Sequence, residues 1–515
     1  MGWLRWFWRQ LTSMRTALFL LLLLAVAAVP GSLVPQRSSD PNGVSKYFVD
    51  HPDIAPFLDK LQAFDVYTSV WFSAIYLLLF ASLIGCIIPR TKHHLDALRA
   101  KPPRTPVRLT RMAGFQARLL PADLARDAPE PIAAARDILR KSGYRVALYE
   151  DARSTSVSAE RGYLRETGNL VFHTALLGIL LAIGFGGGFG FTGQKIVVEG
   201  QSFVNSLPSY NSFNPGRFFS DSSLQPFSIR VDSLKVAYET KNKNALGEPI
   251  DYTANVTTTG PGGATGTTTI KVNEPLAIGG TNVYLLGNGY APTITVRDPK
   301  GHVVFTDSVP FIPQDSQLTS LGYIKVPDGL SQQLGMIGFF YPTVGKSQTA
   351  AGALTSIYPG LRDPVLSLNV WAGDLGVDSG VPQSVYSLNT DSLKQLAGPP
   401  TKKAALQVKP GQTIELPNGM GTLSFDNVKR YVSLDVHHDP AQVWVLVFAI
   451  LILAGLLTSL FVPRRRIWVK SVDNGDGSHT LEYAGLARGE DPNLIAAVTS
   501  VADEHSAVLT RIRNT

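Results

Sequence analysis

The chain has 515 residues, of which 17% are charged and 44% hydrophobic, and its net charge is +7. This length exceeds one compact domain and this charge content is low for a soluble protein, so we expect a few membrane spans joined to a large soluble part. The basic excess lies beside apolar runs, where it sets membrane orientation, which argues against nucleic-acid binding. The single cysteine, Cys86, excludes an internal disulfide and a CxxC redox pair.

Four apolar runs in the sequence are each long enough to cross a bilayer, which takes about 20 helical residues. We predict four transmembrane helices, at residues 17–34, 70–89, 168–190 and 441–462. Basic residues border these runs within residues 1–16, within residues 90–111 and at residues 464–466. Because cytoplasmic loops are enriched in Lys and Arg, four spans with both termini cytoplasmic satisfy every basic cluster. The competing interpretation of the first run is a cleaved signal peptide with a small-residue site at residues 25–27.

The segments on either side of the second span differ in pattern. Residues 35–69, an outer loop in this topology, carry apolar residues at helical spacing, which predicts an amphipathic helix on the membrane surface or against a partner span. Residues 90–167 and the tail 463–515 would both be cytoplasmic. In them we predict five short strands and two helices, at residues 115–119, 131–141, 144–149, 155–159, 467–472, 479–483 and 493–511. We expect these two segments to pack together as one small α+β unit.

Residues 191–440 are rich in Val, Thr, Ser, Gly and Pro, with alternating apolar and polar residues broken by turn residues. This pattern is typical of many short strands, so we predict a large all-β domain with a sandwich-like arrangement. In the topology above, this β domain is extracytoplasmic. The predicted fold class is a membrane protein with four transmembrane α-helices, a large all-β extracytoplasmic domain and a small cytoplasmic α+β unit.

His173 is the one ionisable residue in the third apolar run, residues 168–190. An ionisable side chain inside a membrane is costly and therefore indicates a ligand, a proton or a partner helix. A neutral histidine bonded to a neighbouring helix, or one that reaches the interface, explains the same position equally well. The position alone leaves these interpretations open.

Several short motifs occur in a fixed order around the four runs. They are Pro35-Gln36, Asp65 to Phe72, Ser82 to Arg90, Gly162 to Glu166, Asn169 to His173, Lys271 to Leu276, Gly279 to Tyr284, Asp439-Pro440, Gly455, Pro463 to Arg466 and Trp468. In this order they resemble the ResB family, also called CcsB, the membrane component of system II cytochrome c biogenesis. The resemblance covers most of the chain. The tryptophan-rich loop of the second family component, ResC or CcsA, is not in this sequence, so a separate partner chain is implied.

The resemblance implies that the chain and a ResC/CcsA-type partner carry heme b across the membrane and present it to apocytochrome c for covalent attachment. It makes His173 an axial ligand of the heme iron, with a histidine of the partner opposite. Heme is a flat apolar macrocycle whose iron accepts an imidazole, and the Leu, Ile and Phe residues around His173 suit it. A small-residue face on the same helix, Ala175, Gly178, Ala182 and Gly184, would permit a neighbouring helix or the heme to approach closely.

The resemblance also implies a place in the cell and in a complex. The chain is expected in the plasma membrane as a subunit of a cytochrome c synthetase complex, and it has no catalytic constellation of its own. The GxSxG elbow, the P-loop and the dinucleotide fingerprint are absent from the sequence. The alternative function is a membrane-anchored extracytoplasmic binding or sensor protein with no heme role. A sensor has no need of a histidine within a span, whereas a heme conduit does.

His437 and His438 directly precede the fourth run, at the outer surface in this topology. This is the level of an external heme or a cytochrome peptide, and adjacent residues point in different directions, so at most one of them reaches a given iron. A solvated interfacial pair is the alternative. The remaining histidines are expected at the surface or beside the basic cluster: His51, His93, His94, His302, His479 and His505. The HExxH and CxxC spacings are absent, so the only metal contact expected is His173 through heme iron.

Overall fold

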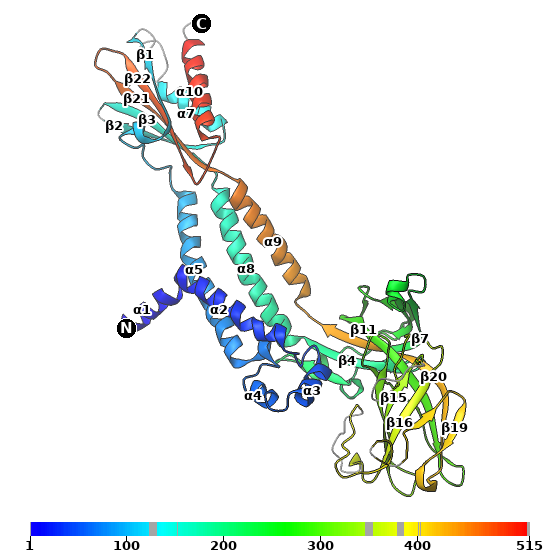
Figure 1. Cartoon of the computed structure of the whole chain (residues 1–515). Helices are drawn as coiled ribbons and strands as arrows, with labels where there is room; N and C mark the ends of the chain where they lie inside the picture. The colour runs from blue at the N-terminus through cyan, green and yellow to red at the C-terminus, as the bar shows by residue number, and fades with distance from the viewer. Residues whose placement is uncertain are drawn as a thin grey trace. The chain divides into compact units, whose positions relative to one another are not determined.

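The computed structural model describes residues 2–122, 131–151, 153–345, 354–377, 386–399, 401 and 403–511 (Figure 1). The chain forms two compact units. The first combines Met1–Gly184 with Ala441–Thr515, and the second is Phe185–Pro440. Among these described residues, one five-stranded sheet belongs to the first unit, and three sheets belong to the second.

Four helices of the described chain are long and apolar enough to cross a membrane, by length and composition. They are α2 (Met14–Leu33), α5 (Val70–Arg99), α8 (Leu164–Phe189) and α9 (Gln442–Phe461), and a shorter helix, α1 (Gly2–Leu11), precedes them. A helix satisfies every backbone group within its own segment, which is why runs of Leu, Ile, Val and Ala take this form where water is excluded. The prediction of four long apolar helices is confirmed.

The helix of the second apolar run continues beyond residue 89, where the predicted span ends. Pro89 lies inside α5, and the chain stays helical to Arg99. A proline removes one backbone hydrogen bond, and side-chain contacts on either side of it support the helix. The hydroxyl of Thr91 donates to the carbonyl of Ile87 at 2.9 Å, and His94 bonds to a hydroxyl of α8 at 3.0 Å. The end of the apolar run is therefore not the end of the helix.

The single amphipathic helix predicted within residues 35–69 is wrong. The structure has two short helices, α3 (Pro41–Asp50) and α4 (Ala55–Lys60), followed by the 3-10 turn η1 (Val66–Thr68). Pro52 lies in the break, where its missing N–H and fixed φ oppose a continuous helix. The apolar residues instead bury one another in a small cluster that includes Val44, Ala55 and Phe64.

Glycines bring the backbones of α8 and α9 into contact. A Cβ added at Gly168 of α8 would lie 2.8 Å from the carbonyl oxygen of Gly455 in α9, and a Cβ at Gly455 would lie 2.7 Å from the carbonyl oxygen of Gly168. Helix α5 also contacts α8, because the hydroxyl of Tyr76 donates to the carbonyl of Leu180. Close backbone packing of this type stabilises helix association in a membrane, where the lipid is as apolar as the side chains and the hydrophobic effect does not drive helices together.

The sheet of the first unit joins two segments that are distant in sequence. Its antiparallel strand order is β1-β22-β21-β3-β2. The strands are β1 (Ala113–Leu120), β2 (Arg145–Asp151), β3 (Ser154–Arg161), β21 (Arg464–Asp473) and β22 (His479–Arg488). Helices α7 (Pro131–Lys141) and α10 (Leu494–Arg511) cover it, and the 3-10 turn η2 (Leu109–Arg111) precedes β1. The two segments, which we expect to pack together, are joined in this sheet by the β3–β21 ladder.

Strand periodicity explains the core of this sheet. Val157, Val469 and Tyr483 lie on neighbouring strands in register and share one buried cluster with Leu139 of α7 and Val498 of α10. Since alternate residues of a strand face opposite sides, both helices cover the same face, as Figure 1 shows at the top of the view. The opposite face carries Glu160 and Trp468, which belong to the other alternate set.

One histidine of this unit differs from its expected position. His505 was predicted at the surface, but it is fully buried on α10, between the hydroxyl of Tyr483 at 2.8 Å and the carbonyl of Pro131 at 2.7 Å. Burial lowers the pKa of this imidazole. The residues next to His505 in the sequence are polar, which favoured a surface position. Which face of α10 packs against the sheet depends on the fold and cannot be read from this histidine alone.

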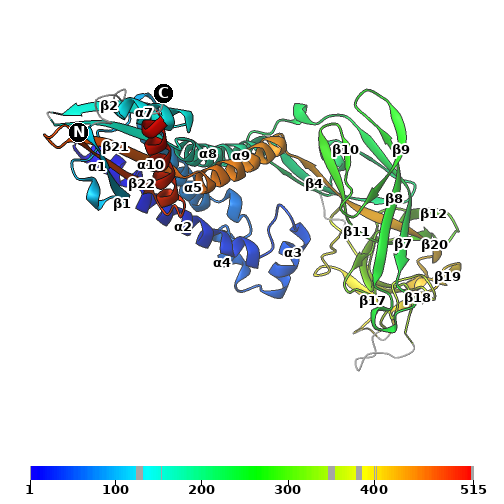
Figure 2. The same ribbon diagram turned by 90° about the horizontal axis from the view of Figure 1, so that it is seen from above.

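The second unit contains three antiparallel sheets. The seven-stranded sheet comprises β4 (Phe191–Val198), β6 (Ser212–Pro215), β10 (Leu276–Ile278), β11 (Thr281–Arg297), β12 (Val303–Ser308), β19 (Gln412–Glu415) and β20 (Thr422–His438). The six-stranded sheet comprises β13 (Ile312–Pro313), β14 (Ser320–Val326), β15 (Leu334–Tyr341), β16 (Val365–Ala372), β17 (Lys394–Ala397) and β18 (Leu406–Val408). The four-stranded sheet comprises β5 (Ser202–Val204), β7 (Ser228–Tyr238), β8 (Pro249–Thr259) and β9 (Thr265–Lys271), and Figure 2 shows the last three side by side.

Two long strands of the second unit, β11 and β20, pair along almost their whole length and contribute to two separate cores. Ile294 of β11 and Phe425 of β20 are fully buried against the six-stranded sheet, for example against Leu368. At the other end of the same ladder, Val283 and Val436 are fully buried against the four-stranded sheet. The region is sheet-rich, as the sequence predicts, and its centre is this one ladder.

Candidate functional site

The imidazole of His173 lies within α8, roughly two and a half turns from the start of the helix at Leu164. Its Nδ1 atom is 2.8 Å from the backbone carbonyl oxygen of Asn169, one turn earlier in the helix. The ring of Phe172 meets it edge-on, with 5.0 Å between the ring centroids. The side chain is half-buried.

This hydrogen bond determines what the imidazole can do. A carbonyl oxygen only accepts, so Nδ1 carries the proton in the neutral ring and Nε2 carries the free lone pair. A histidine that binds a metal usually has one ring nitrogen bonded to a carbonyl or carboxylate, which orients the other toward the metal. Among the residues that the structure describes, none forms a hydrogen bond with Nε2 of His173. The arrangement therefore suits an axial ligand of heme iron through Nε2.

The small residues near His173 contact neighbouring helices. Ala175 and Ala182 are buried, Gly178 faces the ring of Phe448 in α9, and Gly184 lies 3.6 Å, by its added Cβ, from the hydroxyl of Tyr76 in α5. Of the two uses that the sequence allows for this face, helix packing is the one seen in the structure.

His437 and His438 occupy the last two positions of β20 and point to opposite faces of the sheet. Nε2 of His437 is 2.7 Å from a carboxylate oxygen of Asp435, and its ring meets Tyr284 edge-on. Nδ1 of His438 is 2.8 Å from the carbonyl oxygen of Gly280, and its ring stacks on Phe191 at 5.4 Å between centroids. Each histidine therefore has a different hydrogen-bond partner. The ring nitrogen that does not take part in this hydrogen bond is Nδ1 in His437 and Nε2 in His438.

We expect Asp435→Asn to lower the pKa of His437. The hydrogen bond that the imidazole donates to the carboxylate of Asp435, together with the negative charge of that carboxylate, raises the pKa of His437 against the opposing effect of burial. A pKa that is higher in the folded state than in the unfolded state adds stability. This stability is fully present at a pH below the pKa of the unfolded state, about 6.5, and is lost as the pH rises through the pKa of the folded state. The measurement is an NMR titration of histidine-labelled protein, with the His437 signal assigned by its loss in His437→Gln.

The control for this titration is Asp307→Asn, which changes an exposed carboxylate of β12 in the same sheet. This substitution is expected to leave the His437 titration as it is. Equal titrations of His437 in the wild type and in Asp435→Asn would contradict the assignment of the raised pKa to Asp435.

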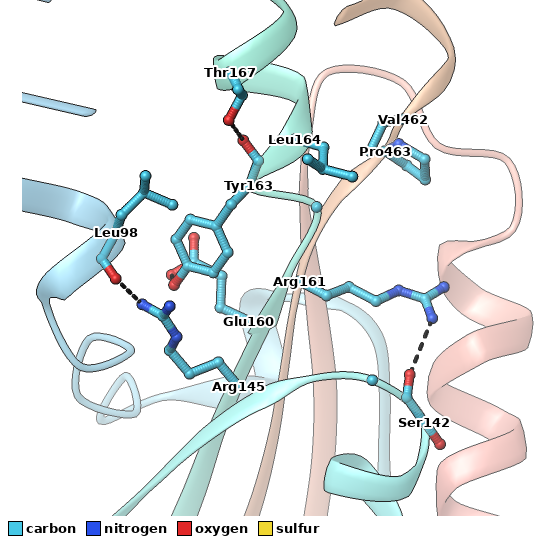
Figure 3. Close-up of a pocket in the computed structure, with 12 residues that line it drawn as sticks. Leu98, Ser142, Arg145, Glu160, Arg161, Tyr163, Leu164, Thr167, Val462 and Pro463 are labelled. Atoms are coloured by element: carbon cyan, nitrogen blue, oxygen red, sulfur yellow. Dashed lines mark hydrogen bonds between the residues drawn. The ribbon is translucent and has the colours of Figure 1, made fainter. Parts of the chain in front are cut away.

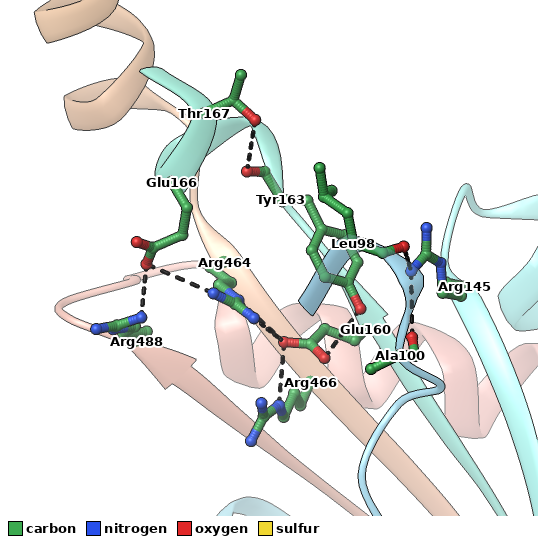
Figure 4. Close-up of polar contacts among 10 residues, drawn as sticks. All are labelled: Leu98, Ala100, Arg145, Glu160, Tyr163, Glu166, Thr167, Arg464, Arg466 and Arg488. Atoms are coloured by element: carbon green, nitrogen blue, oxygen red, sulfur yellow. Dashed lines mark hydrogen bonds and ion pairs between the residues drawn. The ribbon is translucent and has the colours of Figure 1, made fainter. Parts of the chain in front are cut away.

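A second polar cluster, which the sequence analysis missed, surrounds Glu160 at the end of β3 (Figure 4). The Glu160 side chain is 3% exposed. Its oxygens accept from Arg464 at 2.9 Å and from the hydroxyl of Tyr163 at 3.1 Å, and Arg466 lies at 3.2 Å. Glu166 continues the cluster to Arg464 and to Arg488. The signal in the sequence is the run of three arginines after the fourth span, which by itself indicates membrane orientation.

Glycine at position 162 permits this cluster to form. Gly162 has φ of +90°, and a Cβ there would lie 2.8 Å from the Cα of Arg464. Only glycine combines this backbone conformation with so close an approach. The corner between β3 and α8 therefore presses against the start of β21, which brings Glu160 and Arg464 together. Among the described residues, no group of three or more His, Cys, Asp and Glu side chains is placed to hold a metal ion.

These features define a class of protein: a multi-span membrane protein with a large sheet-rich region and a histidine inside one of its apolar helices. The model of the ResB-like family matches residues 14–498 of the sequence. The chain therefore belongs to the ResB-like family.

Relatives with curated names agree with this family. A protein named "Cytochrome c biogenesis protein CcsB" from Microcystis aeruginosa is 27% identical over 298 residues, which cover 56% of this chain and 61% of the relative. Proteins of the same name from Prochlorococcus marinus (strain MIT 9312) and Nostoc sp. (strain PCC 7120) are 25% and 26% identical over 288 and 238 residues, covering 53% and 45% of this chain and 59% and 48% of the relatives. The chain thus spans about three fifths or less of the length of these relatives.

Proposed function

We propose that this chain is a component of cytochrome c biogenesis that, together with a ResC/CcsA-type partner, carries heme b across the membrane and presents it to apocytochrome c. Membership of the ResB-like family and the name shared by the curated relatives support this proposal. The observation that carries it is the hydrogen bond from Nδ1 of His173 to the carbonyl of Asn169, because it leaves Nε2 free to bind iron within an apolar helix.

The roles of the residues follow from their surroundings. His173 binds the heme iron through Nε2, and the partner chain supplies the opposite axial ligand. The aromatic ring of Phe172 beside it offers an apolar contact to the macrocycle. His437 and His438, at the last positions of β20 before α9, are the candidates for contact with an external heme. His438 is the better placed of the two to bind an iron, because its Nδ1 donates to a carbonyl and its Nε2 can then act as the ligand atom. In His437, the Nε2 atom is already hydrogen-bonded to Asp435.

The orientation in the membrane is part of the proposal. Arg464 to Arg466 directly follow α9, and further basic residues follow α5. Since basic residues remain on the cytoplasmic side, both termini and the five-stranded sheet would be cytoplasmic in the plasma membrane, and the second unit would be extracytoplasmic. This arrangement would present β20 to apocytochrome c on the outside.

The test is the heme absorption spectrum of the full chain purified with its partner. We expect His173→Ala to lose most of the bound heme, because an axial ligand is removed, and added imidazole to restore the wild-type spectrum by occupying the vacated space. The matched control is His302→Ala, an exposed histidine of the second unit that pairs with Asp298. It is expected to leave the spectrum unchanged.

A wild-type spectrum and heme content in His173→Ala would overturn the assignment of this ligand. The amount of partner that copurifies separates this result from loss of folding, since a misfolded variant would lose the partner as well. A chain without heme in every variant and in the wild type would favour the alternative, a membrane-anchored binding or sensor protein.

A further inference from the structure

Helix α1 exposes four large aromatic side chains within a stretch of six residues. Trp3 is 82% exposed, Trp6 is 57% exposed, and Phe7 and Trp8 are each 52% exposed. Single exposed apolar residues are common on protein surfaces, whereas a contiguous patch of large ones indicates a partner or a membrane. This helix therefore requires an apolar environment on one side.

The aromatic and basic residues of α1 lie on opposite faces. A helix turns by about 100° per residue, so Trp3 and Phe7 lie one above the other on one face. Arg5 and Arg9 lie one above the other on the opposite face, and Trp6 lies at the border between the two faces. This division is typical of a helix that lies in a membrane interface, with its aromatic face toward the acyl chains and its basic face toward the head groups.

The two arginines of α1 are available to an anion from outside the chain. Among the described residues, none forms an ion pair or a hydrogen bond with the guanidinium of Arg5 or Arg9. Arg145 is different: at a pocket of about 630 Å³ in the same unit (Figure 3), it donates to the carbonyl of Leu98 at 2.5 Å. The sequence also contains no Asp or Glu before Asp40, so the positive charge of α1 is not balanced by neighbouring residues.

The corner between α1 and α2 is held against α5. The hydroxyl of Ser82 donates to the carbonyl of Leu11 at 2.5 Å, and the thiol of Cys86 donates to the carbonyl of Thr12 at 3.0 Å. Gly85 lies between these two positions, and a Cβ there would overlap Cγ2 of Thr12. The absence of a side chain on α5 therefore permits the contact, and Figure 1 shows α1 and α2 meeting in a bend beside α5.

Where α5 crosses a bilayer, this corner lies at the depth of an interfacial helix. The apolar run of α5 ends at Ile88, and Ser82 and Cys86 precede it by about 9 and 3 Å along the helix axis. An amphipathic helix lies about 5–10 Å into the boundary between head groups and acyl chains. Arg90 and Lys92 follow the apolar run and indicate the level of the head groups.

We propose that α1 lies in the membrane interface and binds anionic phospholipids, with Trp3 and Phe7 in the acyl region and Arg5 and Arg9 at lipid phosphates. Because the corner after α1 is bonded to α5, this binding also fixes the depth of α5 in the bilayer. The proposal depends on α5 crossing the membrane. It depends neither on heme ligation by His173 nor on the side of the membrane that the termini occupy.

The test is the depth of a spin label on the full chain in vesicles of equal parts dioleoylphosphatidylcholine and dioleoylphosphatidylglycerol. In a Cys86→Ser background, which keeps a donor at that position, the label is attached at Phe7→Cys or, as the reference in water, at Arg153→Cys in the exposed turn between β2 and β3. Collisions with oxygen report lipid, and collisions with a water-soluble nickel chelate report water. We expect the ratio of oxygen to nickel collisions to be several-fold higher at position 7 than at position 153.

The double variant Arg5→Gln/Arg9→Gln tests the charge. It is expected to weaken the association of α1 with the mixed vesicles about thirtyfold, because each basic residue near an anionic surface adds to the attraction, and to lower the collision ratio at position 7. In vesicles of dioleoylphosphatidylcholine alone, we expect the double variant and its parent to give the same ratio. The matched control, Lys46→Gln/Lys60→Gln, removes two exposed lysines of α3 and α4 and is expected to change neither ratio.

Added sodium chloride tests the same attraction without a substitution, since it screens charges near the surface, and it is expected to lower the ratio at position 7 in the mixed vesicles. Equal ratios at positions 7 and 153 would show that α1 lies in water and would overturn the proposal. A label at position 7 that is shielded from both reagents would also overturn it, because a protein surface would then cover α1. If neither the double variant nor salt changes the ratio in the mixed vesicles, anionic lipid is not the partner. The spectrum of His173→Ala is independent of all these outcomes.

Discussion

Replacement of Gly455 by alanine is expected to force α8 and α9 apart and to destabilise the first unit. The added Cβ would lie 2.7 Å from the carbonyl oxygen of Gly168 and 2.7 Å from the backbone nitrogen of Phe172. Both are main-chain atoms of α8, so rotation of a side chain does not relieve the overlap. Overpacking of a close contact costs about 1–3 kcal/mol, and a backbone contact lies at the upper end of this range. The measurement is the unfolding temperature of the full chain in detergent.

The control for this substitution is a glycine of α8 that lies outside the contact with α9. Gly187 lies on α8, and a Cβ added there meets no atom within 4 Å. Gly187→Ala is therefore expected to keep or slightly raise the unfolding temperature, because alanine is favoured over glycine in a helix by about 1 kcal/mol. Equal unfolding temperatures for Gly455→Ala and Gly187→Ala would show that the two backbones do not touch at this crossing. A lower heme content in Gly455→Ala is also expected, since Phe172 precedes His173.

The sequence predicts the membrane-type helices well because an apolar run carries its own signal. Length and composition identify all four runs, and the structure has a helix at each. The ends are less well predicted, because a helix end depends on backbone partners. Pro89 ends the apolar run but not the helix, and His94 beyond it is held by Thr167 from another helix. Contacts of this kind are between distant residues and leave no mark in the local sequence.

The same distinction applies to the sheets. The predicted strands near residues 115, 145, 155, 467 and 479 are all present, since alternation of apolar and polar residues is a local signal. The order β1-β22-β21-β3-β2 and the register that places Arg466 opposite Glu160 are set by long-range pairing. His505, which was expected at the surface, is internal for the same reason, because α7 covers it from a distant part of the sequence.

For the candidate site, the sequence identifies the residue but not its chemical state. His173 is singled out by being ionisable in an apolar run, whereas its tautomer depends on a hydrogen bond of the folded helix. The histidines at the end of β20 also look alike in sequence, but the strand directs one to Asp435 and the other to Gly280. The cluster around Glu160 was missed because its partners come from residues about 300 positions later.

Removal of the Glu160 carboxylate is expected to be the most destabilising single change in the first unit. In Glu160→Ala, Arg464, whose side chain is 12% exposed, keeps only Glu166 at 3.5 Å, and Arg466 loses its partner. Breaking a buried ion pair by removing one partner costs about 3–5 kcal/mol, because the remaining charge stays buried without compensation. For a unit of this size, this corresponds to an unfolding temperature lower by about 10 °C.

Two further variants assign this effect to the buried charge. Glu160→Gln keeps the shape of the side chain and removes the charge, so a loss close to that of Glu160→Ala is expected if the arginines require a carboxylate. Asp503→Ala removes a partner of Arg118 in the same unit, but Asp503 is 64% exposed and an exposed pair contributes less than about 1 kcal/mol. If Glu160→Ala lowers the unfolding temperature no more than Asp503→Ala does, then water reaches Arg464 and Arg466 and the cluster is not a buried one. If Glu160→Gln is as stable as the wild type, the hydrogen bonds of the side chain, and not its charge, hold β3 against β21.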